Sequence, residues 1–249
     1  MANSGQIKNG VVYLEAADSI GIMTIDNGSQ NKIPKPDFVD LNVLKEWIHE
    51  QDLKGLIITG QGRHFSAGAD VDGIRAGRDN PQHMKEALKK GKNILSYIEA
   101  LPIVTVAAVS GVCFGAGLEI ALSCQFRICT ESAVLAFPES NLGIMPGLAG
   151  TIRLPRKTGR GRAIEIILSG RTINAEEAYN IGLVDRIVQN KTHISSSIEF
   201  IRQLTQNKSN QQIKFIIEAI NNATSENYET ACYCEGDFFV KLLEEEEFK

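Results

Sequence analysis

The sequence predicts an α/β domain followed by a helical C-terminal region. A unit of buried strand, glycine-tipped turn and helix recurs three times, over residues 53–100, 103–124 and 126–168. The strands are short apolar runs rich in β-branched residues, which is typical of strands buried on both faces of a sheet. From about residue 192 the chain is more polar, and its apolar residues recur at helical spacing. We therefore expect a core over residues 1–190 and a helical region over residues 191–249.

The segment before the first unit is expected to hold a hairpin and a helix. Short apolar strands at residues 11–14 and 20–25 flank a turn of small and polar residues. A turn-rich loop follows at residues 27–36. Apolar residues at helical spacing then predict an amphipathic helix over residues 40–51.

The remaining elements alternate between short strands and helices. Residues 71–80 are rich in glycine and charge and are expected to be mobile, whereas residues 81–100 have the apolar spacing of a helix. Pro138 begins a loop or a short helix that carries Glu139. Further strands are expected at residues 126–130 and 133–136, and further helices at residues 160–168, 175–180, 194–204 and 211–220.

Two isolated carboxylates lie in the most apolar part of the chain. Glu119 is the only charged residue in the run 102–124, and Glu139 is the only charged residue in the run 133–152. Burying an ionised carboxylate without a nearby cation costs free energy. Two such acids, each in its own apolar run, predict a shared role.

The turn before Glu119 has the composition of an anion-binding helix start. Gly115, Ala116 and Gly117 open an apolar helical segment whose first N–H groups have no partner within the helix. Small residues let a ligand approach that backbone closely, and the helix dipole favours negative charge there. A carbonyl oxygen could therefore sit on the Ala116 N–H while Glu119, about one turn further on, reaches the reacting carbon. A tight packing turn with one buried, partnered Glu would produce the same pattern.

Four stretches, in order along nearly the whole chain, resemble the motifs of the enoyl-CoA hydratase/isomerase (crotonase) family. They read F-S-A-G-A-D from Phe65, G-V-C-F-G-A-G-L-E-I from Gly111, A-F-P-E-S-N-L-G-I-M-P-G-L-A-G-T-I-R-L from Ala136, and G-R-T-I-N-A-E-E-A-Y-N-I-G-L-V from Gly170. Twenty positions separate Glu119 from Glu139, which is the family's spacing. Ala116 replaces the middle residue of the family's usual Gly-Gly-Gly, but a backbone N–H survives this change.

The resemblance implies a crotonase-like spiral of ββα units and an oxyanion hole made of two backbone N–H groups, those of Ala69 and Ala116. It also implies that the helix at residues 81–100 lines the acyl pocket and that residues 142–146 wall it off. Five residues are expected on the coenzyme A side of the substrate: Lys32, Ala67, Gly68, Asp70 and Val71. Lys35 is an alternative to Lys32 for the phosphates, either lysine could be merely solvated, and Asp70 could serve to hold its turn. His64 is expected to be a surface residue.

By resemblance, the expected activity is reversible hydration of a 2-enoyl thioester, with Glu139 serving the α-carbon proton and Glu119 the water. A double-bond isomerase could manage with Glu139 alone, and a polyketide-pathway dehydratase would act on a carrier-bound thioester. The chain could also be a non-catalytic or nucleic-acid-binding relative. The intact acid pair and the net charge of −4 argue against that reading.

Partners and compartment follow from the same resemblance and from composition. We expect a homotrimer or a dimer of trimers, an acyl thioester as substrate, and no nucleic-acid or membrane partner. Coenzyme A is expected as part of the substrate and no other cofactor. The odd count of five cysteines and a start without a signal peptide favour the cytoplasm. The pair Cys232 and Cys234 lacks the second pair of a metal site, so no metal is expected.

Overall fold

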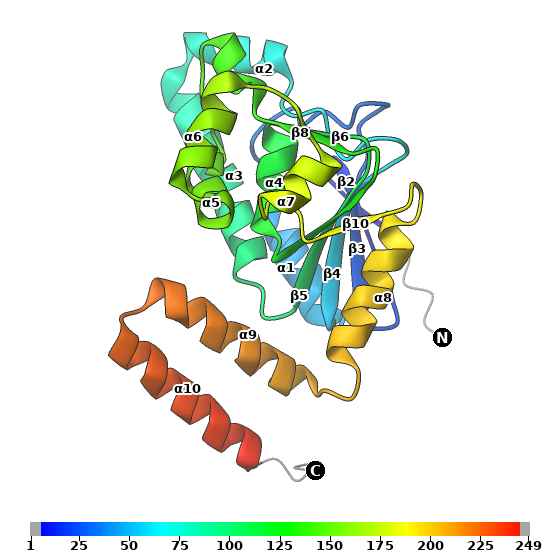
Figure 1. The fold of residues 1–249 in the computed structure, drawn as a ribbon, viewed down its shortest axis with the longest axis vertical. Helices are drawn as coiled ribbons and strands as arrows, with labels where there is room; N and C mark the ends of the chain where they lie inside the picture. The colour runs from blue at the N-terminus through cyan, green and yellow to red at the C-terminus, as the bar shows by residue number, and fades with distance from the viewer. Residues whose placement is uncertain (1–5, 245–249) are drawn as a thin grey trace.

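A seven-stranded mixed sheet forms the centre of the computed structural model, which describes residues 6–244 (Figure 1). The strand order is β1-β2-β3-β4-β5-β7-β10. The first three strands pair antiparallel and the rest join in parallel. The strands are β1 (Ile7–Asn9), β2 (Val12–Ala17), β3 (Ile20–Ile25), β4 (Gly55–Gly60), β5 (Val104–Val109), β7 (Phe126–Thr130) and β10 (Arg186–Val188).

The predicted hairpin is confirmed, with a tighter turn than expected. In the register of β2 and β3, Ala17 pairs with Ile20, so only Asp18 and Ser19 form the loop. Asp18 has a φ of 52°, which a two-residue hairpin turn requires. The strand β1 was not predicted from the sequence, because three residues are too few to show a period of two.

A second, three-stranded sheet lies beside the first and has the order β6-β8-β9. Its strands are β6 (Val112–Phe114), β8 (Val134–Ala136) and β9 (Ile173–Asn174). An isolated bridge between Ser66 and Cys113 continues this pairing toward the turn after β4. Thus β5 and β7 are each followed by a short strand of the second sheet and then by a helix, which repeats one ββα unit along the chain.

Helices cover the sheet, and most of them match the predicted ranges. They are α1 (Leu41–Glu50), α2 (Val71–Ala76), α3 (Pro81–Glu99), α4 (Ala116–Ser123), α5 (Gly150–Thr158), α6 (Arg160–Ser169), α7 (Ala175–Asn180), α8 (His193–Thr205), α9 (Asn210–Ser225) and α10 (Tyr228–Leu243), with 3₁₀ turns η1 (Gly77–Asp79) and η2 (Pro138–Leu142). The segment expected to be mobile, residues 71–80, is helical in α2 and η1. No helix in residues 6–244 has both the length and the apolar content that a membrane span needs.

The parallel strands lie between two hydrophobic cores, one on each face of the sheet. Leu56 and Ile58 of β4 point into the main core, while Ile57 between them points into a second core on the opposite face. Phe200 and Ile201 of α8 close that second core. Burial on both faces explains why the strand sequences are continuous apolar runs without alternation.

The last two helices form a hairpin of their own. Phe215 of α9 stacks on Phe238 of α10, with ring centroids 4.7 Å apart. Figure 1 shows this pair below the sheet, whereas α8 runs along it. The first helix after the expected domain boundary at residue 190, α8, therefore packs on the sheet. The division into a core and a C-terminal helical region stays a prediction. Apart from Glu244, the acidic run at the C-terminus lies outside the described residues. The first five residues, which bear on the expected absence of a signal peptide, also lie outside them.

Candidate active site

The start of α4 lies against the turn that follows β4. Gly115 precedes the helix with φ of 49° and ψ of −120°, and its N–H donates to the Ala136 carbonyl oxygen at 2.9 Å. A Cβ atom added to Gly68 would lie 2.9 Å from the Phe114 carbonyl oxygen and 3.7 Å from the Ala116 nitrogen. The two segments expected to supply oxyanion donors are thus in contact. Within residues 6–244, neither the Ala69 nor the Ala116 N–H donates a hydrogen bond.

Asn31 holds the turn that carries Ala69, and the sequence analysis did not single it out. Its side-chain amide donates to the carbonyl oxygens of Gln61 and His64 at 2.9 and 2.7 Å. Its own carbonyl oxygen accepts from the Ser66 hydroxyl at 2.7 Å, and that hydroxyl accepts from the Gly68 N–H at 3.1 Å. A single asparagine in a polar loop has no sequence signal that reveals such a role.

His64 is a half-buried structural residue, which corrects the expectation of a surface position. Its Nδ1 accepts a hydrogen bond from the Val112 N–H at 3.1 Å. A Cβ atom added to Gly111 would lie 2.5 Å from the same Nδ1. The imidazole therefore joins the turn after β4 to the start of β6, and the distance between the two segments in the sequence conceals this contact.

Glu119 is buried and held at one oxygen. The residue is 2% exposed, and its Oε1 accepts from the N–H groups of Leu148 and Gly150, each at 2.7 Å. Burial raises the pKa of Glu119 to about 7. The Gly150 N–H, and to a smaller extent the Leu148 N–H and Arg153, lower this pKa. Glu139 raises it further. The carboxyl is therefore poised to exchange a proton near neutral pH.

Glu139 lies in the first turn of η2 and faces the start of α4. Its Oε2 is buried and finds no hydrogen-bond partner within residues 6–244. Burial raises the pKa of Glu139 to about 7, against one backbone hydrogen bond that lowers it. A half-buried acid with a buried, unused oxygen is suited to bind a water molecule or a substrate atom. The structure thus brings the two predicted acids close enough together that Glu139 adds to the rise in the pKa of Glu119.

The turn before α5 builds the cradle for Glu119. Ala149 has φ of 74° and ψ of 25°, so the amides on either side of it, Leu148 and Gly150, can point at the same oxygen. Successive N–H groups around a left-handed residue form an anion-binding nest. Leu148 and Gly150 were not named as site residues from the sequence, because they act through backbone atoms alone.

A cavity of about 350 Å³ borders two of the five residues expected on the coenzyme side. Lys32 and Asp70 line it and form an ion pair with 3.7 Å between Nζ and Oδ1. Ala67 donates its N–H to the Gln30 carbonyl oxygen, and Val71 begins α2. Lys35 instead pairs with Asp37 at 3.8 Å.

The acyl side of the site is less enclosed than expected. A Cβ atom added to Gly147 would lie 2.9 Å from Leu88, so α3 borders the loop that carries the nest. Leu142, Ile144 and Met145, which we expected to wall off the pocket, are exposed in the single chain. Cys232 and Cys234 lie on α10, and the described residues contain no cluster of three or more His, Cys, Asp or Glu side chains that could hold a metal.

The comparisons with known proteins define the family. The family model described as enoyl-CoA hydratase/isomerase matches residues 15–249, and the chain belongs to this family. A Bacillus subtilis protein named "Probable enoyl-CoA hydratase" is 32% identical over 239 residues, which cover 96% of this chain and 92% of that protein. The family assignment from the sequence motifs is confirmed.

The solved structures confirm the crotonase-like fold. An enoyl-CoA hydratase from Polaromonas sp. JS666 superposes with a TM-score of 0.86 at 26% identity, covering 94% of this chain and 91% of that one. DspI from Pseudomonas aeruginosa also reaches a TM-score of 0.86, at 28% identity, covering 99% of this chain and 94% of that one. The spiral of ββα units is therefore the fold of this chain.

Proposed function

We propose that the protein is an enoyl-CoA hydratase that reversibly adds water, with syn geometry, to a 2-enoyl thioester and yields the 3-hydroxyacyl thioester. The observation that carries the proposal is the presence of Glu119 beside Glu139, one buried and one half-buried acid whose pKa values both lie at about 7. Near neutral pH each acid is therefore present in both its protonated and its ionised form. A pair with one proton contains both a base and an acid, which is what the addition of water needs.

The proposed mechanism assigns one proton to each acid. Glu119 accepts a proton from water as the oxygen bonds to carbon 3, and Glu139 donates its proton to carbon 2. In the reverse direction Glu139 takes the carbon 2 proton, and Glu119 protonates the departing hydroxyl. The Ala69 and Ala116 N–H groups would hold the thioester oxygen as it gains negative charge, where fixed donors contribute most.

The substrate's coenzyme portion is proposed to lie over the turn that carries Ala69. Lys32 lines the cavity there and is about half exposed, so it can leave Asp70 for a phosphate. Ala67, Gly68, Asp70 and Val71 would border the rest of the nucleotide. We propose coenzyme A as the carrier, with no further cofactor and no metal, and the cytoplasm as the compartment because Cys113, Cys124 and Cys129 are buried free thiols.

The test uses Glu119→Gln and Glu139→Gln, which keep the shape of each acid but cannot carry its proton. Ultraviolet absorbance of crotonyl-CoA follows the hydration. Each change should lower kcat by at least ~10²–10⁴, the usual contribution of general acid–base catalysis. The double variant should be little worse than the poorer single variant, because groups that act as a unit are not additive. Binding of the product thioester should survive, since the backbone donors are unchanged.

An isomerase would give a different pattern in the same variants. Glu139→Gln would then be inactive, and Glu119→Gln would keep most of its activity on a 3-enoyl thioester. A Glu119→Gln enzyme that hydrates its best substrate at the full rate would refute the two-carboxylate mechanism. A panel of thioesters on coenzyme A and on a carrier protein separates the hydratase from a polyketide-pathway dehydratase.

A further inference from the structure

Arg153 is a buried cation that binds the turn next to Glu119. It belongs to α5 and is 4% exposed. Its Nη1 donates to the Leu148 carbonyl oxygen at 2.9 Å, while Nε and Nη2 donate to Oε2 of Glu99 at 3.0 and 2.8 Å. Glu99 is the last residue of α3, so Arg153 ties the turn before α5 to a second helix.

The carbonyl that Arg153 binds lies between the two amides that hold Glu119. The Leu148 and Gly150 N–H groups both donate to Glu119 Oε1, and the Leu148 carbonyl belongs to the peptide unit between them. The orientation of the Leu148 carbonyl therefore depends on the same backbone angles that aim the two N–H groups at Glu119. Ala149, at the centre of the turn, has the left-handed conformation that a non-glycine residue keeps only where its surroundings impose it. The Arg153 hydrogen bond is one such constraint.

The charge of Arg153 also acts on Glu119. Burial raises the pKa of Glu119, the two nest amides oppose the rise, and so does the Arg153 charge. Glu139 on η2 adds to the rise. Glu99 on α3 pairs with Arg153 at 2.8 Å and is 41% exposed, so it offsets only part of that charge.

We propose that Arg153 is a positioning residue for Glu119, with Glu99 as its anchor. It holds the turn at residues 148–150 so that both amides bind Oε1 and leave Oε2 for the reacting water. The inference rests on the proposed hydratase function, in which Glu119 handles the proton of the water. Arg153 would touch no reacting atom and would act through the Leu148 peptide.

The experiment compares Arg153→Gln with Arg156→Gln in the full-length protein. Arg156 is a matched control, because it lies on the same helix, approaches the same Glu99 with 4.0 Å between the charged atoms, and is exposed. Arg153→Gln should lower kcat by ~10–10²-fold with little change in KM, since a small misplacement of a catalytic group is enough for such a loss. Arg156→Gln should keep the wild-type kcat.

The pH profile separates positioning from a merely structural role. Glu119 must be ionised to accept the proton of the water, and the loss of the Arg153 cation favours its protonated form. The acidic limb of kcat should therefore move to higher pH in Arg153→Gln, and it should stay at its wild-type position in Arg156→Gln and in Arg153→Lys. A folded Arg153→Gln enzyme with wild-type kcat and an unmoved limb would overturn the proposal.

A measurement that does not depend on catalysis tests the role of Arg153 separately from the proposed hydratase function. The infrared carboxylic-acid band that disappears in Glu119→Gln reports the protonation of Glu119 directly. It should titrate at higher pH in Arg153→Gln, even if the wild-type protein hydrates no thioester and the proposed function fails. An unchanged titration would overturn the positioning role and leave the hydratase proposal intact.

A second variant keeps the test decisive if Arg153→Gln does not fold. Arg153→Met combined with Glu99→Met removes both charges together and leaves neither one buried without its partner. This double variant should fold and show the same ~10–10²-fold loss of kcat, because the Leu148 carbonyl has lost its donor. Wild-type kcat in the folded double variant would overturn the proposal.

Discussion

A Cβ atom added to Gly115 would lie 2.8 Å from Oε1 of Glu139, so the residue that starts α4 and the acid on η2 are in direct contact. Real Cβ atoms almost never approach another atom so closely. Gly115 also has a backbone conformation that side chains disfavour. The position therefore needs glycine for two reasons: a side chain would displace Glu139, and the backbone conformation disfavours one.

Gly115→Ala should displace Glu139 and lower kcat by ~10–10²-fold, because the acid would no longer reach its substrate atom. Gly62→Ala is the control, since Gly62 has a φ of 77° and an added Cβ would meet nothing within 4 Å. Both variants should also lose stability, because both positions have a positive φ that side chains disfavour. Steady-state kinetics and urea unfolding measure the two effects, and equal kcat values in the two variants would contradict the contact.

Ala116→Pro should remove the proposed oxyanion donor and nearly abolish turnover. Ala116 is the first residue of α4, where proline is tolerated because that N–H has no partner within the helix. The loss of one such donor lowers kcat by about 10²–10³-fold. Circular dichroism checks the fold. A native spectrum with a near-normal rate would count against the donor, whereas a loss alone could also come from a clash between the proline ring and the ligand.

Glu139→Gln should stabilise the folded protein, and more at pH 8 than at pH 5. The pKa of Glu139 rises from 4.5 to about 7 on folding, so the folded state favours the protonated form. The corresponding stability is present below pH ~4.5 and is lost as the pH rises to ~7. At pH 8 the wild type bears a half-buried charge that glutamine lacks, which predicts a gain of about 1–3 kcal/mol, reduced by the partial exposure of the side chain. Thermal unfolding at both pH values measures it, with exposed Glu46→Gln as the control; a pH-independent gain would contradict the assignment.

Ala149→Gly should stabilise the protein by about 1 kcal/mol. Alanine in the left-handed region costs roughly 1–2 kcal/mol, and the greater freedom of glycine in the unfolded chain offsets about 0.4–1 kcal/mol of the gain. Ala149→Val should destabilise, because a branched side chain is less tolerated at a φ of 74°. Chemical unfolding of the three proteins tests the order, and a glycine variant less stable than the valine variant would refute it.

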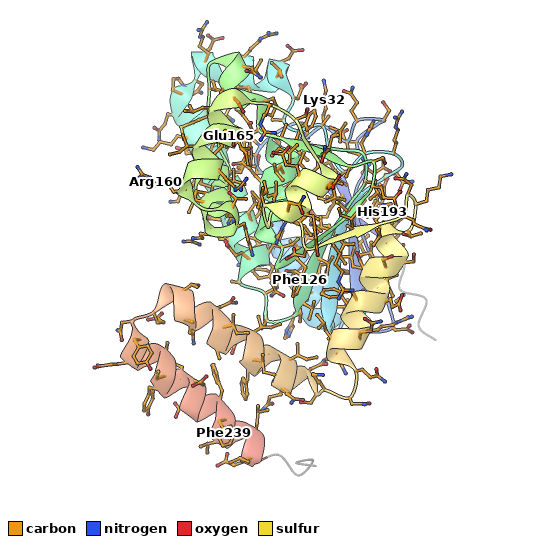
Figure 2. The ribbon with its side chains drawn as sticks, viewed as in Figure 1. Lys32, Phe126, Arg160, Glu165, His193 and Phe239 are labelled. Atoms are coloured by element: carbon orange, nitrogen blue, oxygen red, sulfur yellow. The ribbon has the colours of Figure 1, made fainter. Side chains whose placement is uncertain are left out.

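The helical hairpin of α9 and α10 should bind other copies of the chain. Its exposed apolar residues include Ile220 on α9 and Phe239 on α10, each more than 60% exposed. Figure 2 shows Phe239 at the opposite end of the molecule from Lys32, so the hairpin leaves the coenzyme-side cavity of its own chain uncovered. Light scattering should find a trimer or a dimer of trimers. Ile220→Asp combined with Phe239→Asp should dissociate it, whereas Gln211→Glu should not; a wild-type monomer at micromolar concentration would refute the assembly.

The sequence by itself determined the family, the α/β class and the two acids. Glu119 and Glu139 stand out because each is the single charge in an apolar run, and the Gly-Ala-Gly start of α4 is a local signal of the same kind. Periodicity located most of the long helices and buried strands, since those patterns depend on neighbours within one or two turns, but α5 and α10 were given no helical range.

Tertiary structure alone decided what holds those acids. The nest from Leu148 and Gly150 uses backbone N–H groups, which carry no residue code, and the Arg153–Glu99 pair joins helices 54 positions apart in the chain. His64 and Asn31 looked like loop residues, yet each links segments 30 or more positions apart. A side chain's type states what it can bond to, but only the folded path of the backbone brings its partner within hydrogen-bonding distance.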